Sequence, residues 1–205
     1  MARYKIIRNF LSLFISKKKL ENLSVFYIVR IAYKKLMTIN GINNITLILI
    51  NDRYTQEEFV NDPEIMTFKS LDELKGFSCT ERLTNLYKNN YFAKGSSLFS
   101  VVKEKKIIAS TWLHYNFDPD SDIDLIRINN YFLLGPTFVD LEYRNLGLST
   151  RLKKYACYYL KNKGCYPIYL GNEIDNIPTI KTSIKAGFRL HRIIIRTRNG
   201  EPIIL

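Results

Sequence analysis

The pattern of hydrophobic and polar positions changes along the chain. In residues 3–37 apolar side chains recur at helical spacing among many lysines and arginines, which predicts two basic helices with a break near 16–19. The run ITLILI at 45–50 predicts a buried strand, and IMTFK at 65–69 predicts a second, short strand. A helix that keeps its apolar residues on one face is predicted over 80–92.

From residue 97 onwards, strands predominate. SLFSVV and IIASTWLHYN flank the polar KEKK and predict a hairpin. YFLLGPTFVDL predicts a strand that Gly135-Pro136 interrupts, because proline has no N–H for the ladder. The helix STRLKKYACYYLKNKG is expected to end at Gly164, and a strand CYPIYLGN, a helix IPTIKTSIKAGF and a strand RLHRIIIRT follow. This order predicts a mixed α/β domain.

Length and composition suggest how these elements are organised. A chain of 205 residues with 46% hydrophobic and 13% aromatic side chains is expected to form one globular domain with an appendage. We expect a helical, basic N-terminal extension over 1–44 and the mixed α/β domain over 45–205. The extension is predicted to pack on the main domain. A peripheral membrane contact through the lysines of residues 1–37 is the alternative.

The formal charge of +12 favours anionic partners such as nucleotide phosphates, nucleic acid or a lipid surface. A composition crowded with Ile, Asn, Lys and Tyr, as in proteins from AT-rich genomes, explains the same charge equally well. Nucleic-acid binding is not expected. It needs a clustered basic face with stacking aromatics, whereas Lys and Arg are spread over nearly every segment.

Metal binding and membrane insertion are not expected either. Three cysteines without a CxxC pair and two histidines are too few for a zinc site, and the acidic loop DPDSDID at 118–124 lacks the ligand spacing of a calcium loop. The run VFYIV is among the longest apolar runs, is far shorter than a membrane-spanning helix and is followed by Arg30. We expect a cytoplasmic protein, with membrane association as the alternative already named.

The segment EYRNLGLSTRL, Glu142 to Leu152, joins the interrupted strand to the long helix. Arg144 stands three residues before Gly147, and the small Ser149 stands two residues after it. A helix start exposes unpaired N–H groups that attract anions, and a glycine lets the backbone approach one closely. The spacing alone fits an ordinary capped helix as well as a phosphate-binding loop, and it matches neither GxxxxGK[ST] nor GxGxxG.

The neighbourhood of this loop adds a resemblance. FVDLEYRNLGLSTRL, with NEIDN and a helix ending in KAGF after it, resembles the GNAT superfamily of acyl-CoA-dependent N-acyltransferases over about residues 63–198. In that family the loop pattern is a hydrophobic residue, four residues, [RQ]-x-x-G-x-[GA]. Its amides hold the pyrophosphate of coenzyme A. The resemblance implies a mixed, mostly antiparallel sheet with a splay between the strand at 131–141 and the strand at 166–171, flanked by helices.

Carried over by position, the resemblance implies a set of cofactor-binding residues. The loop amides would face the pyrophosphate, the main chain at the strand end would pair with the pantetheine arm, and the asparagine that opens the next helix would lie near the cofactor. These positions are Phe138, Val139, Arg144, Asn145, Leu146, Gly147, Leu148, Ser149 and Asn176.

Three positions depart from the family pattern. The final small residue is Ser149 rather than Gly or Ala, and Leu141 stands where many members have proline. Many members also carry a tyrosine four residues before the closing glycine, which protonates the leaving thiolate. Here that position is Ser183, so either another group supplies the proton or the thiolate leaves unaided.

Acyl transfer from a thioester to an amine also needs a polarised carbonyl and a base. Backbone N–H groups near Thr137 and Phe138 are expected to polarise the carbonyl. Among the carboxylates, Glu173 is the preferred acid-base residue, because it stands at the mouth of the expected splay, and Asp140 is the next.

The resemblance thus implies an enzyme that moves an acetyl or other acyl group from acyl-CoA to the amine of a small molecule. An amino sugar or a cell-surface precursor is the preferred acceptor. The alternative is a module of the same fold that binds coenzyme A or another anion without turnover.

Overall fold

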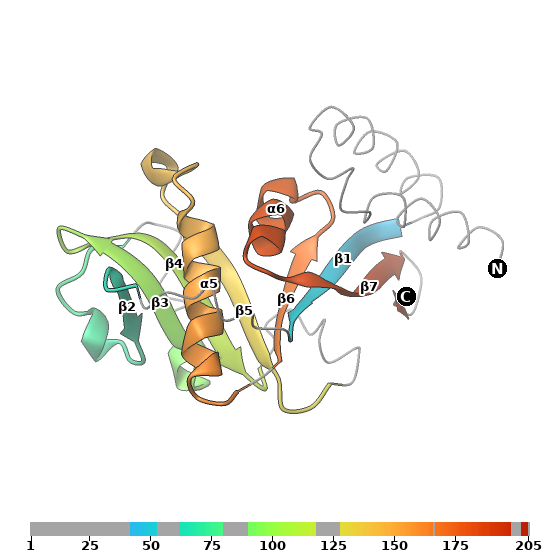
Figure 1. Cartoon of the computed structure of the whole chain (residues 1–205), viewed down its shortest axis with the longest axis horizontal. Helices are drawn as coiled ribbons and strands as arrows, with labels where there is room; N and C mark the ends of the chain where they lie inside the picture. The colour runs from blue at the N-terminus through green and yellow to red at the C-terminus, as the bar shows by residue number, and fades with distance from the viewer. Residues whose placement is uncertain are drawn as a thin grey trace.

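The computed structural model describes residues 42–52, 62–79, 90–117, 128–165, 167–197 and 202–204 (Figure 1). The helices predicted over 3–37 and the acidic loop at 118–124 lie outside these ranges. So does most of the helix predicted over 80–92, of which residues 90–93 are helical. The division of the chain at residue 44 stays a prediction. Within the described ranges, no helix has the length and apolarity to cross a membrane.

Eight strands form one sheet in the order β2-β3-β4-β5-β6-β1-β7-β8. Every neighbouring pair is antiparallel except β5 and β6, which run parallel, so the predicted mixed, mostly antiparallel sheet is confirmed. The strands are β1 Ile42–Asn51, β2 Ile65–Phe68, β3 Ser97–Lys103, β4 Lys106–Tyr115, β5 Phe132–Val139, β6 Ile168–Glu173, β7 Arg189–Thr197 and β8 Ile203–Ile204. Among the described residues, the complete helices are α5 Leu148–Lys161 and α6 Ile177–Lys185, with short 3-10 turns η2 Asp72–Leu74 and η3 Leu141–Tyr143.

The predicted hairpin is present as β3 and β4. Its two turn residues, Glu104 and Lys105, have φ angles of 50° and 61°, and Lys103 pairs with Lys106. Positive φ at both central residues gives a turn whose twist matches that of the strands. Apolar side chains then alternate between the two faces: Phe99 packs on one side of the sheet and Leu98 on the other.

The predicted splay lies between β5 and β6. These strands pair only at Phe132–Ile168 and Leu133–Tyr169, although β5 continues to Val139 and β6 to Glu173. Gly135, with a φ angle of 131°, stands two residues after the last pair. The main-chain groups of β5 that face β6 are therefore without that strand as a partner beyond Leu133.

Helices α5 and α6 cover the same face of the sheet and contact each other. In Figure 1 α5 crosses β4 and β5, and α6 lies beside it toward β6 and β1. The stripe Leu148, Leu152, Ala156 and Leu160 of α5 is buried, and α5 contacts β3, β4 and β5 on one side of the splay, while α6 lies toward β6 and β1 on the other. The seam between α5 and α6 consequently runs above the gap between β5 and β6.

Candidate functional site

The loop between β5 and α5 turns twice before the helix begins. Asn145 and Gly147 have φ angles of 65° and 78°, and Gly147 is the residue that precedes the first helical turn. A left-handed backbone is easiest for glycine, which explains why the sequence has glycine at 147. The side chain of Leu148 is buried in the core and fixes the start of the helix below the loop.

Six consecutive amides of this loop point to no protein acceptor. The amide of Arg144 donates to Leu141 O at 3.3 Å, and the next main-chain donor is Arg151 N, which bonds to Gly147 O at 3.0 Å. In the described part of the chain, the N–H groups of residues 145–150 have no hydrogen-bond partner. Unpaired amides at a helix start carry partial positive charge and favour an anion. The loop therefore fits the pyrophosphate that the resemblance implies.

The two polar side chains predicted to help this loop have different surroundings. The exposed Arg144 lies back along the loop, and its Nε donates to Val139 O at 3.4 Å. Ser149 Oγ donates to Thr182 Oγ1 on α6 at 3.2 Å, so the hydroxyl points to the neighbouring helix. Ser149 thus joins α5 to α6, and its amide rather than its hydroxyl remains open to a ligand.

His114 fixes the backbone at the splay. Its Nε2 lies 2.6 Å from Gly135 O and its Nδ1 lies 2.6 Å from Ser96 Oγ. A carbonyl oxygen only accepts, so Nε2 carries the proton and Nδ1 accepts from the serine. Burial lowers the pKa of His114 to about 4, although the bond to Gly135 acts in the opposite direction. His114 is therefore a neutral support of the bend in β5.

The two carboxylates that the sequence favours for acid-base chemistry lie on different sides of the loop. Asp140 forms an ion pair with Lys106 on β4, at 2.8 Å between Oδ2 and Nζ. Because β4 lies on the side of β5 away from the splay, this pair holds Asp140 away from the gap. Glu173 ends β6, and its Oε1 accepts from Asn44 Nδ2 at 3.2 Å on the exposed surface. Asn44 belongs to β1, which lies on the side of β6 away from the gap, so the observed bond of Glu173 does not point into the gap either. Both acid-base roles stay predictions.

Asn176 opens α6, as its position in the sequence predicts. Its Oδ1 accepts from the amide of Thr179 at 3.4 Å, and the proline that follows at position 178 suits the first turn. A role of Asn176 at the cofactor stays a prediction.

Sequence reasoning missed a buried lysine between α5 and α6. The side chain of Lys153 is 2% exposed, and its Nζ donates to Thr182 Oγ1 at 2.7 Å, Ser183 Oγ at 3.0 Å and Thr179 O at 3.3 Å. Burial lowers its pKa to about 7. The available signal was the register: Lys153 lies one position after Leu152 of the buried stripe and four before the buried Cys157, on the flank that meets α6.

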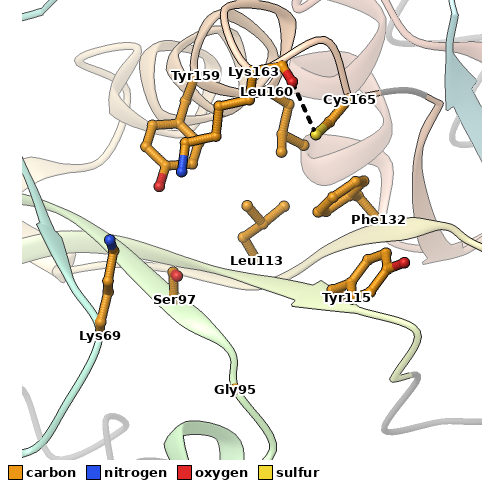
Figure 2. A pocket seen from close by; sticks show the side chains of 10 residues that line it. All are labelled: Lys69, Gly95, Ser97, Leu113, Tyr115, Phe132, Tyr159, Leu160, Lys163 and Cys165. Atoms are coloured by element: carbon orange, nitrogen blue, oxygen red, sulfur yellow. Dashed lines mark hydrogen bonds between the residues drawn. The ribbon is translucent and has the colours of Figure 1, made fainter.

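A separate cavity of about 320 Å³ lies at the other end of β5 (Figure 2). Tyr159, Leu160 and Lys163 approach it from the C-terminal end of α5 and the turn after it, and strand residues form its floor. Figure 2 shows the amines of Lys69 and Lys163 on opposite walls of the cavity. Its lining is Lys69, Gly95, Ser97, Leu113, Tyr115, Phe132, Tyr159, Leu160, Lys163 and Cys165. Two cations above an apolar floor suit an anionic ligand with an apolar body.

Among the residues that the structure describes, no three His, Cys, Asp or Glu side chains are grouped so that they could bind a metal ion.

The comparisons with known proteins agree with the fold. The chain is similar to a GNAT-family acetyltransferase from Colwellia psychrerythraea, with 18% identity, a TM-score of 0.55, and coverage of 80% of this chain and 59% of that chain. It is also similar to a protein assigned to the GNAT family from Novosphingobium aromaticivorans, with 17% identity, a TM-score of 0.55, and coverage of 76% and 65%. The chain thus spans less than two thirds of the length of either protein.

No curated protein matches the sequence. A family model described as the acetyltransferase (GNAT) family matches residues 65–188, which is more than half of the chain and includes the loop, the splay and both helices. The chain therefore belongs to the GNAT acetyltransferase family.

Proposed function

We propose that the protein is an acyl-CoA-dependent N-acyltransferase that acylates the amine of a small molecule. One observation carries this proposal: the described residues offer no acceptor to the amides of residues 145–150, which follow β5, the strand that separates from β6. Members of the family use acyl-CoA as the donor. In this protein the loop amides would hold its pyrophosphate, and main-chain groups of β5 at Phe138 and Val139 would pair with its pantetheine arm.

Different residues around the gap would polarise the thioester carbonyl, position the backbone and remove the proton of the amine. In an antiparallel ladder, main-chain groups point alternately to the two sides of a strand, so half of those between Gly135 and Val139 face away from β4. N–H groups of that half near Thr137 are positioned to polarise a thioester carbonyl. His114 holds this stretch of backbone in place, and Glu173 removes the proton of the acceptor amine directly or through water.

Binding of the acyl donor is tested by thermal unfolding with and without acetyl-CoA. A ligand that binds only the folded state adds about 2.7 kcal/mol at one hundred times its dissociation constant. We expect a clear rise in Tm for the parent protein and little or none for Arg144→Glu, which places a negative charge beside the loop. An unchanged Tm for the parent at millimolar acetyl-CoA would refute the proposal.

Transfer of the acyl group to an amine is tested by measuring the release of free thiol with a panel of amines. We expect turnover with at least one class among amino sugars, amino acids and polyamines, and we place amino sugars first. Ser183 in place of the family's tyrosine favours the alternative, a module that binds coenzyme A without turnover. A rise in Tm with acetyl-CoA, together with no thiol release for any amine of the panel, would support that alternative.

A further inference from the structure

The leaving sulfur of a thioester takes a proton when it departs, and the usual tyrosine that supplies it is absent here. Its position is Ser183, which is fully buried on α6 and whose hydroxyl donates to Thr179 O at 2.8 Å. The nearest strong proton donor to that hydroxyl comes from the other helix. Lys153 Nζ lies 3.0 Å from Ser183 Oγ. We propose that Lys153 is the acid that protonates the leaving sulfur through the Ser183 hydroxyl, an inference that rests on the proposed transfer from acyl-CoA.

The three hydrogen-bond partners of Lys153 Nζ all require it to be the donor. Its Nζ meets three acceptors, Thr179 O, Thr182 Oγ1 and Ser183 Oγ, and an ammonium has three donors and no acceptor. Both hydroxyls send their own protons to Thr179 O, so their lone pairs are free to accept from the lysine. The site is therefore built to bind a protonated amine.

The surroundings of this ammonium are uncharged. From α6 it meets only hydroxyls and a carbonyl. Cys157, one turn further along α5, stays a thiol because burial raises its pKa, and Asn51 of β1 donates to its Sγ at 3.4 Å. Burial is the only cause that lowers the pKa of Lys153, and no described carboxylate pairs with it. A buried ammonium without a counter-ion releases its proton more readily than an exposed one, as an acid near neutral pH requires.

Lys153 lies between the two helices that cover the gap. It crosses the seam between α5 and α6, and this seam lies over the gap between β5 and β6. Thr182, which accepts from Lys153, also accepts from Ser149 at the start of α5, in the loop that fits the pyrophosphate. The same pair of helices thus carries the loop and the lysine.

The proton balance of the proposed step is simple. The lone pair of the neutral acceptor nitrogen forms the new bond to the acyl carbon, and the electron pair of the carbon–sulfur bond goes to sulfur. The Ser183 hydroxyl gives its proton to sulfur as Lys153 gives one to Ser183 Oγ along their hydrogen bond, and the acceptor nitrogen loses one proton to Glu173 or water. Lys153 then recovers a proton from water, which restores the ammonium.

The test compares the parent with Lys153→Met, which keeps the length of the side chain and removes the proton. Thr182 and Ser183 keep their bonds to Thr179 O, so folding and acetyl-CoA binding are expected to persist, as thermal unfolding checks. We expect kcat to fall about 100-fold or more. Lys154→Met, on the same helix, is the matched control and should keep the parent's kcat.

A second readout does not depend on turnover. The thiol pKa of bound coenzyme A, followed by the ultraviolet absorbance of its thiolate, should be lower in the parent than in Lys153→Met, because a nearby ammonium stabilises a thiolate. Lys153→Arg keeps the charge but holds its proton far more tightly. It should preserve the lowered thiol pKa and still lose activity.

The outcomes separate the two proposals. If the parent turns over and Lys153→Met matches it in kcat and in thiol pKa, the lysine has no role and the enzyme proposal stands. Full activity in Lys153→Arg would also overturn proton donation, because charge alone would then suffice. If the parent neither binds coenzyme A nor releases thiol, the enzyme proposal is wrong, and the role of Lys153 is then wrong as well because it depends on that proposal.

Discussion

Replacing Lys153 by methionine is expected to stabilise the protein at low pH. In the folded state burial lowers the pKa of Lys153 from 10.5 to about 7, and each unit corresponds to 1.36 kcal/mol. The buried ammonium therefore costs on the order of 5 kcal/mol below pH 7, where both the folded and the unfolded chain carry the proton. Methionine removes this cost and fills nearly the same space.

The direction of this pH dependence follows from the number of protons that the folded and the unfolded chain bind. Between pH 7 and 10.5 the unfolded chain holds a proton on Lys153 that the folded chain has lost, so rising pH stabilises the parent relative to the variant. The advantage of Lys153→Met should consequently shrink by about 3 kcal/mol between pH 6 and pH 9.

Urea unfolding of the parent and Lys153→Met at these two pH values measures the difference directly, because the titrations of all other groups cancel in the comparison. Lys154→Met controls for the loss of a positive charge from α5. An advantage of the same size at both pH values would refute the reasoning, since it would mean that Lys153 keeps its ordinary pKa despite its burial. A destabilised Lys153→Met at pH 6 would show that its three hydrogen bonds outweigh the cost of burial.

Three further predictions concern other parts of the site. The parent should lose about 3 kcal/mol of stability between pH 7 and pH 4, because His114 stays neutral in the folded state down to about pH 4 while it charges near pH 6.5 when unfolded, and urea unfolding of His114→Gln should lack this loss. Asn176→Ala should lower the free energy of unfolding by about 1 kcal/mol through the lost helix cap, with no change in the m-value. Ser97→Trp, which fills the cavity beside Lys163, should leave the rise in Tm with acetyl-CoA unchanged, and a lost rise would place that cavity in the donor site.

The sequence predicted those parts of the fold that depend on short-range chemistry. Gly135-Pro136 indicated the irregularity inside β5, which is a shift of register against β4 within a continuous strand; Gly164 follows the end of α5, and Asn176 precedes α6. Each of these residues acts through its own backbone or its immediate neighbours, so a single sequence is enough to find it.

Long-range features were not accessible in the same way. The strand predicted at 45–50 is longer, begins at Ile42 and inserts between β6 and β7, a pairing with residues more than a hundred positions away. Nothing in the sequence indicated that Lys153 is buried, because the pattern of a helix shows which face is apolar but not which neighbour covers its flank. The two-residue strand β8 is too short to give a pattern.

The short contact between β5 and β6 divides the sheet into two ribbons. One contains β2 to β5 under α5, and the other contains β6, β1, β7 and β8 beside α6. In the sheet itself only two residue pairs hold them together. An extended ligand in the gap would act as a temporary ninth strand and complete the ladder that the protein leaves open. Without such a ligand the sheet itself joins the two ribbons through those two pairs, and the core under α5 and α6 supplies the rest of the connection.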